Sequence, residues 1–206
     1  MERTYELQAK EKGAKWIVGI DEVGRGCLFG DVVACAIVMP DTDPIEGVRD
    51  SKKLSEKKRE VLYEEILKEA LAVGIGRVNA ELIDEMNIKE AARLAMQKAV
   101  LALRTPEGEH VPVDYLLVDA EHVDLPISQE AIIHGDDLCY SVACASIVAK
   151  VFRDRLCVKW NRTYPGYGLA KHKGYGTKMH RYALKEKGPT PMHRKSFLKK
   201  ILDRSE

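Results

Sequence analysis

The segment 19–26 reads Gly-Ile-Asp-Glu-Val-Gly-Arg-Gly and holds the side chains best suited to chemistry. Asp21 and Glu22 close a short apolar run, and acids at the end of a strand can bind a hard cation such as Mg²⁺. Gly24, Arg25 and Gly26 follow. Glycine lets backbone N–H groups approach a phosphate or sugar, and arginine can pair with phosphate. The segment therefore suggests metal and phosphate chemistry. For the acidic pair taken alone, the alternative is a strand end that is simply exposed to solvent.

Two further apolar segments also end in acid, at Asp119 and at Asp136-Asp137. Strands of one α/β sheet can bring such ends together, although they lie about a hundred residues apart in sequence. Carboxylates gathered without cations would repel one another, and some would take up protons. Divalent ions remove that problem, and two of them roughly 4 Å apart can clamp the attacking and leaving oxygens of a phosphodiester. The acids therefore indicate a candidate site for divalent metal and phosphodiester chemistry.

Two positions in this acidic set are ambiguous. Side chains alternate along a regular strand, so Asp21 and Glu22 cannot both face one side. Either the strand bends at Glu22, or Glu22 has a different role from Asp21. Of Asp136 and Asp137, one is a candidate ligand, while the other can sit near the N-terminus of the following helix, where negative charge is favoured.

Composition excludes several other classes of protein. No apolar run approaches the roughly 20 residues that span a bilayer, and the first 15 residues are polar, without a visible secretory signal. The five cysteines are odd in number and form no Cys-x-x-Cys pair, which argues against a disulfide framework or a zinc site. Neither a Gly-x-Ser-x-Gly elbow nor a Walker A sequence is present. We predict a reducing, cytoplasmic location.

The net charge of +1 conceals a division within the chain. From Lys150 to the end there are 16 basic and 4 acidic residues, a net charge of +12, which leaves −11 for the remainder. Such asymmetry points to a polyanionic partner for the basic end, with a solvated tail as the alternative. Tyrosines in the loop 164–176 can stack on sugars or bases, or simply anchor the loop.

Periodicity predicts alternating strands and helices, and hence an α/β layered fold. Apolar runs predict strands over 16–20, 32–39, 75–78, 113–118 and 131–133. Helices are predicted over 55–73, 80–86, 88–103, 139–160, 177–187 and 194–202. In the first of these, Ser55 is the expected cap and the buried stripe comprises Val61, Leu62, Ile66 and Ala70. The helix over 139–160 is rich in small residues, which permit close approach to the sheet. We expect one domain over 1–206, with a basic helical appendage from about 177.

Several further motifs accompany these residues in order. They are Asp-Ser-Lys-Lys-Leu-Ser at 50–55, Leu-Val-Asp at 117–119, Gly-Asp at 135–136, Ala-Ser-Ile-Val-Ala-Lys-Val-Phe-Arg-Asp at 145–154 and His-Lys-Gly-Tyr-Gly-Thr at 172–177. With residues 19–26, the set closely resembles prokaryotic ribonuclease HII, the type 2 ribonuclease H family, from about Val18 to Phe197. Departures are modest: Cys27 and Asp31 stand where proline is common, Ala120 where glycine is usual, and His134 where lysine is common.

The resemblance implies a ribonuclease H-like fold, a mixed central sheet flanked by helices with a C-terminal helical extension. It implies endonucleolytic cleavage of RNA–DNA hybrids and of single ribonucleotides embedded in duplex DNA. Cleavage falls 5′ to the ribonucleotide and leaves 5′-phosphate and 3′-hydroxyl ends. The expected role is ribonucleotide removal during replication and repair. The implied partners are nucleic acids, with no membrane and no obligate protein partner, and the chain is expected to be a monomer.

The resemblance also assigns site residues. The positions that hold two Mg²⁺ or Mn²⁺ ions during catalysis fall on four acids: Asp21, Glu22, Asp119 and Asp136. The loop Gly24, Arg25 and Gly26 is expected to recognise the 2′-hydroxyl, with Tyr175 beside the DNA side of the junction. The segment Ser51, Lys52 and Lys53 resembles an element that contacts the nucleic-acid backbone. Two rival functions are a non-catalytic hybrid-binding protein on this fold and another nuclease of the superfold, such as a junction resolvase.

Overall fold

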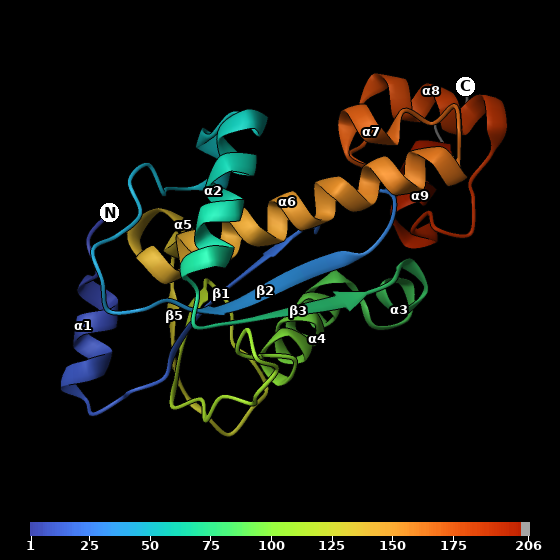
Figure 1. The fold of residues 1–206 in the computed structure, drawn as a ribbon. Helices are drawn as coiled ribbons and strands as arrows, with labels where there is room; N and C mark the ends of the chain where they lie inside the picture. The colour runs from blue at the N-terminus through green and yellow to red at the C-terminus, as the bar shows by residue number, and fades with distance from the viewer. Residues whose placement is uncertain (203–206) are drawn as a thin grey trace.

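The centre of the molecule is a mixed five-stranded sheet with the strand order β3-β2-β1-β4-β5, shown in Figure 1. The computed structural model describes residues 1–202. The strands are β1 (Ile17–Val23), β2 (Val32–Val38), β3 (Ala72–Val78), β4 (Tyr115–Asp119) and β5 (Ser128–Ile132). β1 pairs antiparallel with β2, and β2 with β3, whereas β4 runs parallel to both β1 and β5. The predicted mixed α/β sheet is confirmed.

Helices cover both faces of this sheet. The helical elements are α1 (Thr4–Glu11), η1 (Ser51–Lys53), α2 (Glu56–Glu69), α3 (Ala80–Met86), α4 (Ile88–Leu101), α5 (Gly135–Leu138), α6 (Tyr140–Thr163), α7 (Leu169–His172), α8 (Lys178–Lys187) and α9 (Lys195–Leu202). One core lies between the sheet and α4, and a second lies between the sheet, α2 and α6. Every residue of β2 is buried, as predicted for a strand covered on both faces.

The long helix α6 packs directly on β1, because small residues line the contact. A Cβ atom added to Gly19 of β1 would lie 2.3 Å from the backbone carbon of Ser141, so only glycine fits there. Ala143, Cys144 and Ala145 of α6 are fully buried. The predicted small-residue helix against the sheet is confirmed, although it runs a few residues further than expected. This contact holds α6 against the strand that bears Asp21.

The predicted helix over 55–73 is wrong at its C-terminal end. The cap is as expected, since Ser55 accepts a hydrogen bond from the backbone of Lys58, but α2 ends at Glu69. Residues 72–78 instead pair with the whole of β2, and this ladder overrides the helical pattern. Val61, expected on the buried stripe, is 53% exposed. The sequence did not predict α1, the short helices α5 and α7, or the 3-10 turn η1.

The C-terminal helices α7, α8 and α9 gather at one end of α6, at the upper right of Figure 1. They share a small core with Leu28 and Phe29, which follow the glycine loop after β1. The predicted basic helices are therefore present up to residue 202. Residues 203–206 of the predicted appendage lie outside the described part of the chain. The C-terminal helices thus pack against the loop predicted to bind substrate.

Two observations bear on the environment of the chain. All five cysteines are buried and free of disulfide bonds. Among the helices of residues 1–202, none combines the length and apolar character that crossing a lipid bilayer requires.

Candidate active site

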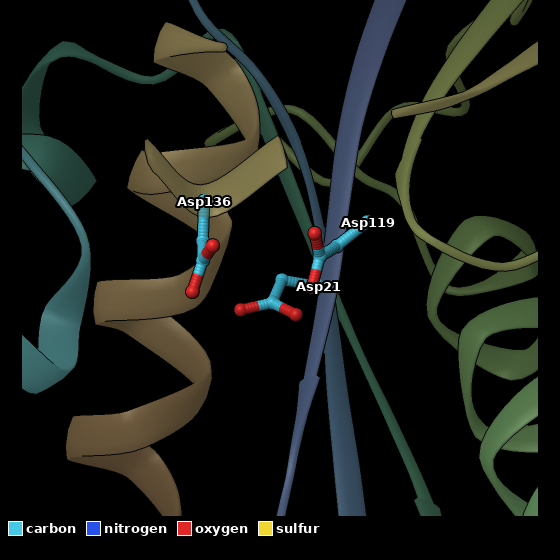
Figure 2. Close-up of side chains that lie close together, drawn as sticks. All are labelled: Asp21, Asp119 and Asp136. Atoms are coloured by element: carbon cyan, nitrogen blue, oxygen red, sulfur yellow. The ribbon is translucent and has the colours of Figure 1, made fainter. Parts of the chain in front are cut away.

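Three carboxylates from separate elements converge at one edge of the sheet, as Figure 2 shows. Asp21 comes from β1, Asp119 from the end of β4, and Asp136 from α5. One ligand oxygen from each lies within 4.8 Å of those from the other two. The parallel pairing of Ile20 with Val118 brings the next residues, Asp21 and Asp119, side by side. The expectation that a sheet would gather these distant acids is confirmed.

The turn between β4 and α5 positions the second and third acids. The backbone N–H of Gly135 donates to Oδ1 of Asp119 over 2.7 Å. Ala120 and His134 adopt left-handed backbone conformations, with φ of 46° and 59°. Such a conformation is costly for residues other than glycine, so Ala120 and His134 carry backbone strain. This chain accepts that strain next to Asp119.

The structure separates the roles open to Asp136 and Asp137. Asp136 is buried within the carboxylate cluster and accepts a hydrogen bond from Nζ of Lys52 over 3.0 Å. Asp137 lies at the surface and is paired with Nζ of Lys53 over 2.7 Å. Only Asp136 of the two is therefore placed to act with Asp21 and Asp119.

Glu22 lies beside the cluster of three but outside it. The β1–β2 ladder stays regular through Asp21 and Glu22, which pair with Cys35 and Ala34, so no bulge re-aims Glu22. Its Oε1 accepts from Nη1 of Arg25 over 3.2 Å, while its Oε2 is buried without a hydrogen-bond partner. The strand therefore does not bend at Glu22, and the Glu22 carboxylate lies beside the three acids rather than among them.

Burial and mutual repulsion disfavour charge on these acids. Burial raises the pKa of Asp21 well above its usual value, and the charges of Glu22 and Asp119 raise it further. Burial also raises the pKa of Asp119, with a further contribution from Asp136. For Glu22, burial raises the pKa and the nearby Arg25 opposes this rise. Without cations, the cluster favours protonated carboxyls.

The donor set of this site fits hard divalent cations. All its ligand atoms are carboxylate oxygens, the donors that Mg²⁺ and Mn²⁺ prefer over nitrogen and sulfur. The buried, unpaired Oε2 of Glu22 offers one further oxygen next to the cluster. A cation there would also relieve the repulsion that raises the pKa of Asp21 and Asp119.

The glycine loop after β1 is held by two buried arginines that the sequence interpretation missed. Nε and Nη2 of Arg153 donate to the carbonyls of Asp31 (2.9 Å) and Phe29 (3.0 Å). Nε and Nη1 of Arg194 donate to the carbonyls of Gly30 (3.0 Å) and Arg25 (2.9 Å). Both side chains are fully buried. Neither arginine had a role assigned from the sequence: Arg194 was one basic residue among many, and Arg153 stood in the motif at 145–154 after an apolar run, which was a signal of burial.

Tyr175 lies next to this loop. It forms an isolated antiparallel bridge with Cys27, and the N–H of Leu28 donates to the carbonyl of Gly174 over 2.8 Å. A Cβ atom built on Gly26 would lie 4.0 Å from the tyrosine ring, which is an ordinary contact. Tyr175 is 42% exposed. The structure therefore brings the predicted tyrosine and the predicted glycine loop together, and it leaves the tyrosine partly exposed to solvent.

The segment 51–53 divides between interior and surface. The hydroxyl of Ser51 is buried and hydrogen bonded to that of Ser146 over 2.9 Å. Lys52 and Lys53 instead extend over the acids, each paired with one aspartate of α5. Burial lowers the pKa of Lys52, but the hydrogen bond to Asp136 and the negative charges of the nearby aspartates together outweigh it, and the net shift is upward. Two cations therefore stand at the rim of the carboxylate cluster, where a phosphate would approach.

Comparisons with known proteins agree on one family. A family model described as Ribonuclease HII matches residues 18–200. The chain is 60% identical over 190 residues to Ribonuclease HII of Alkaliphilus oremlandii (strain OhILAs), covering 92% of this chain and 94% of that protein. It is 53% identical over 195 residues to Ribonuclease HII of Bacillus subtilis (strain 168), covering 94% and 74% respectively.

Solved structures share this fold. The crystal structure of the ribonuclease H2 from Pyrococcus horikoshii OT3 superposes with a TM-score of 0.74 at 25% sequence identity, covering 92% of this chain and 98% of that one. The crystal structure of Bst-RNase HIII in complex with Mn²⁺ gives a TM-score of 0.72 at 16% identity, covering 96% and 72%. The second likeness concerns the fold alone. The sheet and its flanking helices therefore form a ribonuclease H-like fold.

Proposed function

The chain belongs to the ribonuclease HII family, a family of metal-dependent endonucleases of the ribonuclease H type, and from this premise we propose its substrates and mechanism. Ribonuclease H enzymes hydrolyse RNA–DNA hybrids. We propose that this enzyme also cuts at single ribonucleotides embedded in duplex DNA. Cleavage falls on the 5′ side of the ribonucleotide and leaves 5′-phosphate and 3′-hydroxyl ends. The expected cellular role is the removal of ribonucleotides during replication and repair.

The observation that carries this proposal is the cluster of three carboxylates, two buried and one half-buried, beside a glycine loop and a partly exposed tyrosine. Asp21, Asp119 and Asp136, with Glu22 beside them, would hold the divalent ions. Two bound Mg²⁺ or Mn²⁺ ions would supply an activated water and stabilise the leaving 3′-oxygen. The Mn²⁺ complex of the structurally similar Bst-RNase HIII supports Mn²⁺ as one of the candidates.

Substrate selection is assigned to the loop and the tyrosine. Backbone groups of Gly24 to Gly26 would read the 2′-hydroxyl, the group that separates RNA from DNA. Arg194 holds the carbonyl of Arg25 within this loop, and Arg153 holds the carbonyl of Phe29 in the segment that follows, so the loop backbone is positioned before substrate arrives. Tyr175 would pack against the deoxyribose on the DNA side of the junction.

A basic groove continues from this site. Its lining includes Gly26, Gly176 and three basic residues of α8, which are Lys178, Arg181 and Lys185. These residues are one helical turn apart, so their charges lie along one face of α8. The groove would hold phosphates of the duplex, and binding would weaken as salt rises.

The test of the metal assignment is the substitution Asp119→Asn. The amide keeps the side-chain volume and the oxygen that accepts from Gly135, but removes the ligand charge. We expect loss of most cleavage of a labelled RNA–DNA hybrid in Mg²⁺ or Mn²⁺, while hybrid binding survives. Asp137→Asn is the matched control, because Asp137 is the neighbouring surface carboxylate outside the cluster. Full activity of Asp119→Asn would contradict the assignment.

The test of junction recognition is the substitution Tyr175→Ala. We expect a larger loss of cleavage on a duplex with one embedded ribonucleotide than on a long hybrid, because only the junction needs the ring. Equal losses on both substrates would argue against this role. An all-DNA duplex in the same assay separates the proposal from a junction nuclease, which would cut it. Binding without cleavage in either metal would instead favour the non-catalytic alternative.

A further inference from the structure

Three buried histidines lie among the C-terminal helices, close to the turn that contains Tyr175: His172 in α7, His180 in α8 and His193 between α8 and α9. His180 and His193 are 0% and 1% exposed, and His172 is 8% exposed. The rings of His172 and His180 stack with centroids 4.4 Å apart, and Nε2 of His180 lies 3.1 Å from Nε2 of His193. None of them takes part in the proposed chemistry. Buried rings of this kind need defined hydrogen-bond partners, and these rings have them.

The backbone groups around His193 and His180 determine which nitrogens carry protons. The backbone N–H of Thr190 donates to Nδ1 of His193 over 2.9 Å, so that nitrogen is an acceptor. The neutral ring then carries its proton on Nε2 and donates it to Nε2 of His180. His180 in turn carries its proton on Nδ1 and donates it to the carbonyl of Tyr175 over 2.9 Å. Both rings are neutral in this chain of hydrogen bonds.

His172 is neutral by the same reasoning, but it is not part of the hydrogen-bond series that runs from His193 through His180 to Tyr175. The N–H of Gly174 donates to its Nδ1 over 3.2 Å, so its Nε2 proton goes to the carbonyl of Tyr167 over 2.7 Å. His172 therefore orders the turn that precedes Tyr175, while His193 and His180 act on Tyr175 itself.

The hydrogen bonds from His193 through His180 connect Tyr175 to the segment that follows the glycine loop. His193 forms an isolated antiparallel bridge with Phe29. The next residue, Arg194, makes a second backbone contact with the same segment, because its N–H donates to the carbonyl of Leu28 over 2.9 Å. A shift of the segment around His193 would therefore move both the loop and, through His180, the carbonyl of Tyr175.

We propose that His193 and His180 are positioning residues, which hold the Tyr175 turn so that its ring meets the DNA side of a ribonucleotide junction. This inference rests on the junction role proposed for Tyr175. The two imidazoles do not touch substrate; they act through the tyrosine carbonyl. Their effect should therefore fall on the discrimination between single ribonucleotides and long hybrids more than on cleavage in general.

The substitutions His193→Leu and His193→Gln separate hydrogen bonding from packing. Leucine fills part of the space without a donor, whereas glutamine places an N–H where Nε2 stood. For His193→Leu we expect the kcat/KM ratio of single-ribonucleotide duplex to long hybrid to fall by about three- to tenfold, the usual worth of one hydrogen bond. His193→Gln should restore most of that ratio. His110→Leu, at an exposed histidine, is the matched control.

A double-mutant cycle decides whether the histidine acts through the tyrosine. In the Tyr175→Ala background, His193→Leu should change the ratio no further. An additive effect, an equal loss on both substrates, or equal ratios for the leucine and glutamine variants would each overturn the inference. If Tyr175→Ala itself showed no selective loss, the proposed role of Tyr175 would fail first, and that result is distinct from the other three.

A measurement on the wild-type protein keeps the inference testable if the leucine variant does not fold. Imidazole ¹⁵N chemical shifts report which ring nitrogen is protonated. We expect His180 protonated on Nδ1 and His193 on Nε2 at neutral pH. The reverse tautomer of either ring would break the donation to the Tyr175 carbonyl and overturn the inference.

Discussion

Asp21→Asn should stabilise the metal-free protein while abolishing its response to divalent ions. Asp21 is a buried member of the cluster, and its neighbours Asp119 and Asp136 present oxygens within 4.8 Å. The asparagine keeps the oxygen that accepts from the N–H of Glu22, and its amide can donate to the neighbouring carboxylates. The substitution therefore removes a charge without removing a required acceptor.

The size of this effect can be bounded. Two unit charges 4.8 Å apart repel by about 3 kcal/mol at an effective dielectric constant of about 20. The folded protein can avoid this repulsion by protonating Asp21. At pH 7, protonating a carboxyl with an ordinary pKa costs about 4 kcal/mol, and this cost is the upper limit of the stabilisation that Asp21→Asn can give. Because Lys52 offsets part of the repulsion, we expect about 2 kcal/mol. For a domain of this size, that raises Tm by about 4–8 °C.

The pH dependence of this gain has a definite sign. The pKa of Asp21 is raised in the folded state, so its charge destabilises the fold above that pKa, and the penalty vanishes below the unfolded value near pH 4. The Tm difference between Asp21→Asn and wild type should therefore be largest near neutral pH and shrink as pH falls towards 4. Thermal unfolding monitored by circular dichroism in EDTA measures it.

Added metal should reverse the order of stabilities. At a metal concentration of about 100 times Kd, wild type gains about 2.7 kcal/mol of unfolding free energy, or roughly 5–11 °C in Tm. The variant should gain little, because it has lost a ligand charge. A variant that was less stable than wild type in EDTA at pH 7, or that responded to Mn²⁺ as wild type does, would refute the reasoning.

Two further outcomes are expected. Gly24→Ala should destabilise the fold by about 1–3 kcal/mol and reduce cleavage, because Gly24 has φ of 94° and an added Cβ would lie 2.3 Å from Nε of Arg153. Urea denaturation measures the loss of stability, and a hybrid cleavage assay measures the loss of activity. An unchanged unfolding midpoint would contradict this prediction. Burial, reinforced by His180, lowers the pKa of His193 to about 4, so the stability contributed by the neutral ring is complete above about pH 6.5 and is lost as pH falls towards 4. The stability gap between wild type and His193→Gln should therefore narrow over that range in urea titrations, and a constant gap would show that His193 does not titrate there.

Much of the fold follows from local patterns in the chain. The continuous apolar run 32–38 determines a strand covered on both faces, and the small residues of 140–149 determine a helix that lies close to the sheet. The acids that end apolar segments, together with the ordered motifs, indicated the family and three of the carboxylates that meet. These features depend on residue type and on spacing over a few positions, which any reader of the sequence can count.

Only the tertiary structure decided which polar groups become buried and what they meet. Asp136 and Asp137 are the same residue type in adjacent positions, yet one faces Asp21 and the other faces Lys53. Glu22 pairs with Arg25 outside the cluster of three. The alternation of side chains along the strand had left the position of Glu22 undecided.

The same holds for the groups that support the site. Arg153 and Arg194 look like surface charges until packing turns them into buried donors for loop carbonyls that lie more than a hundred residues earlier in the chain. The end of α2 was set by the pairing of β3 with β2 rather than by its own periodicity. Local sequence determines an element and its apolar face, whereas the partner of a charge depends on contacts between distant segments, which exist only once the chain has folded.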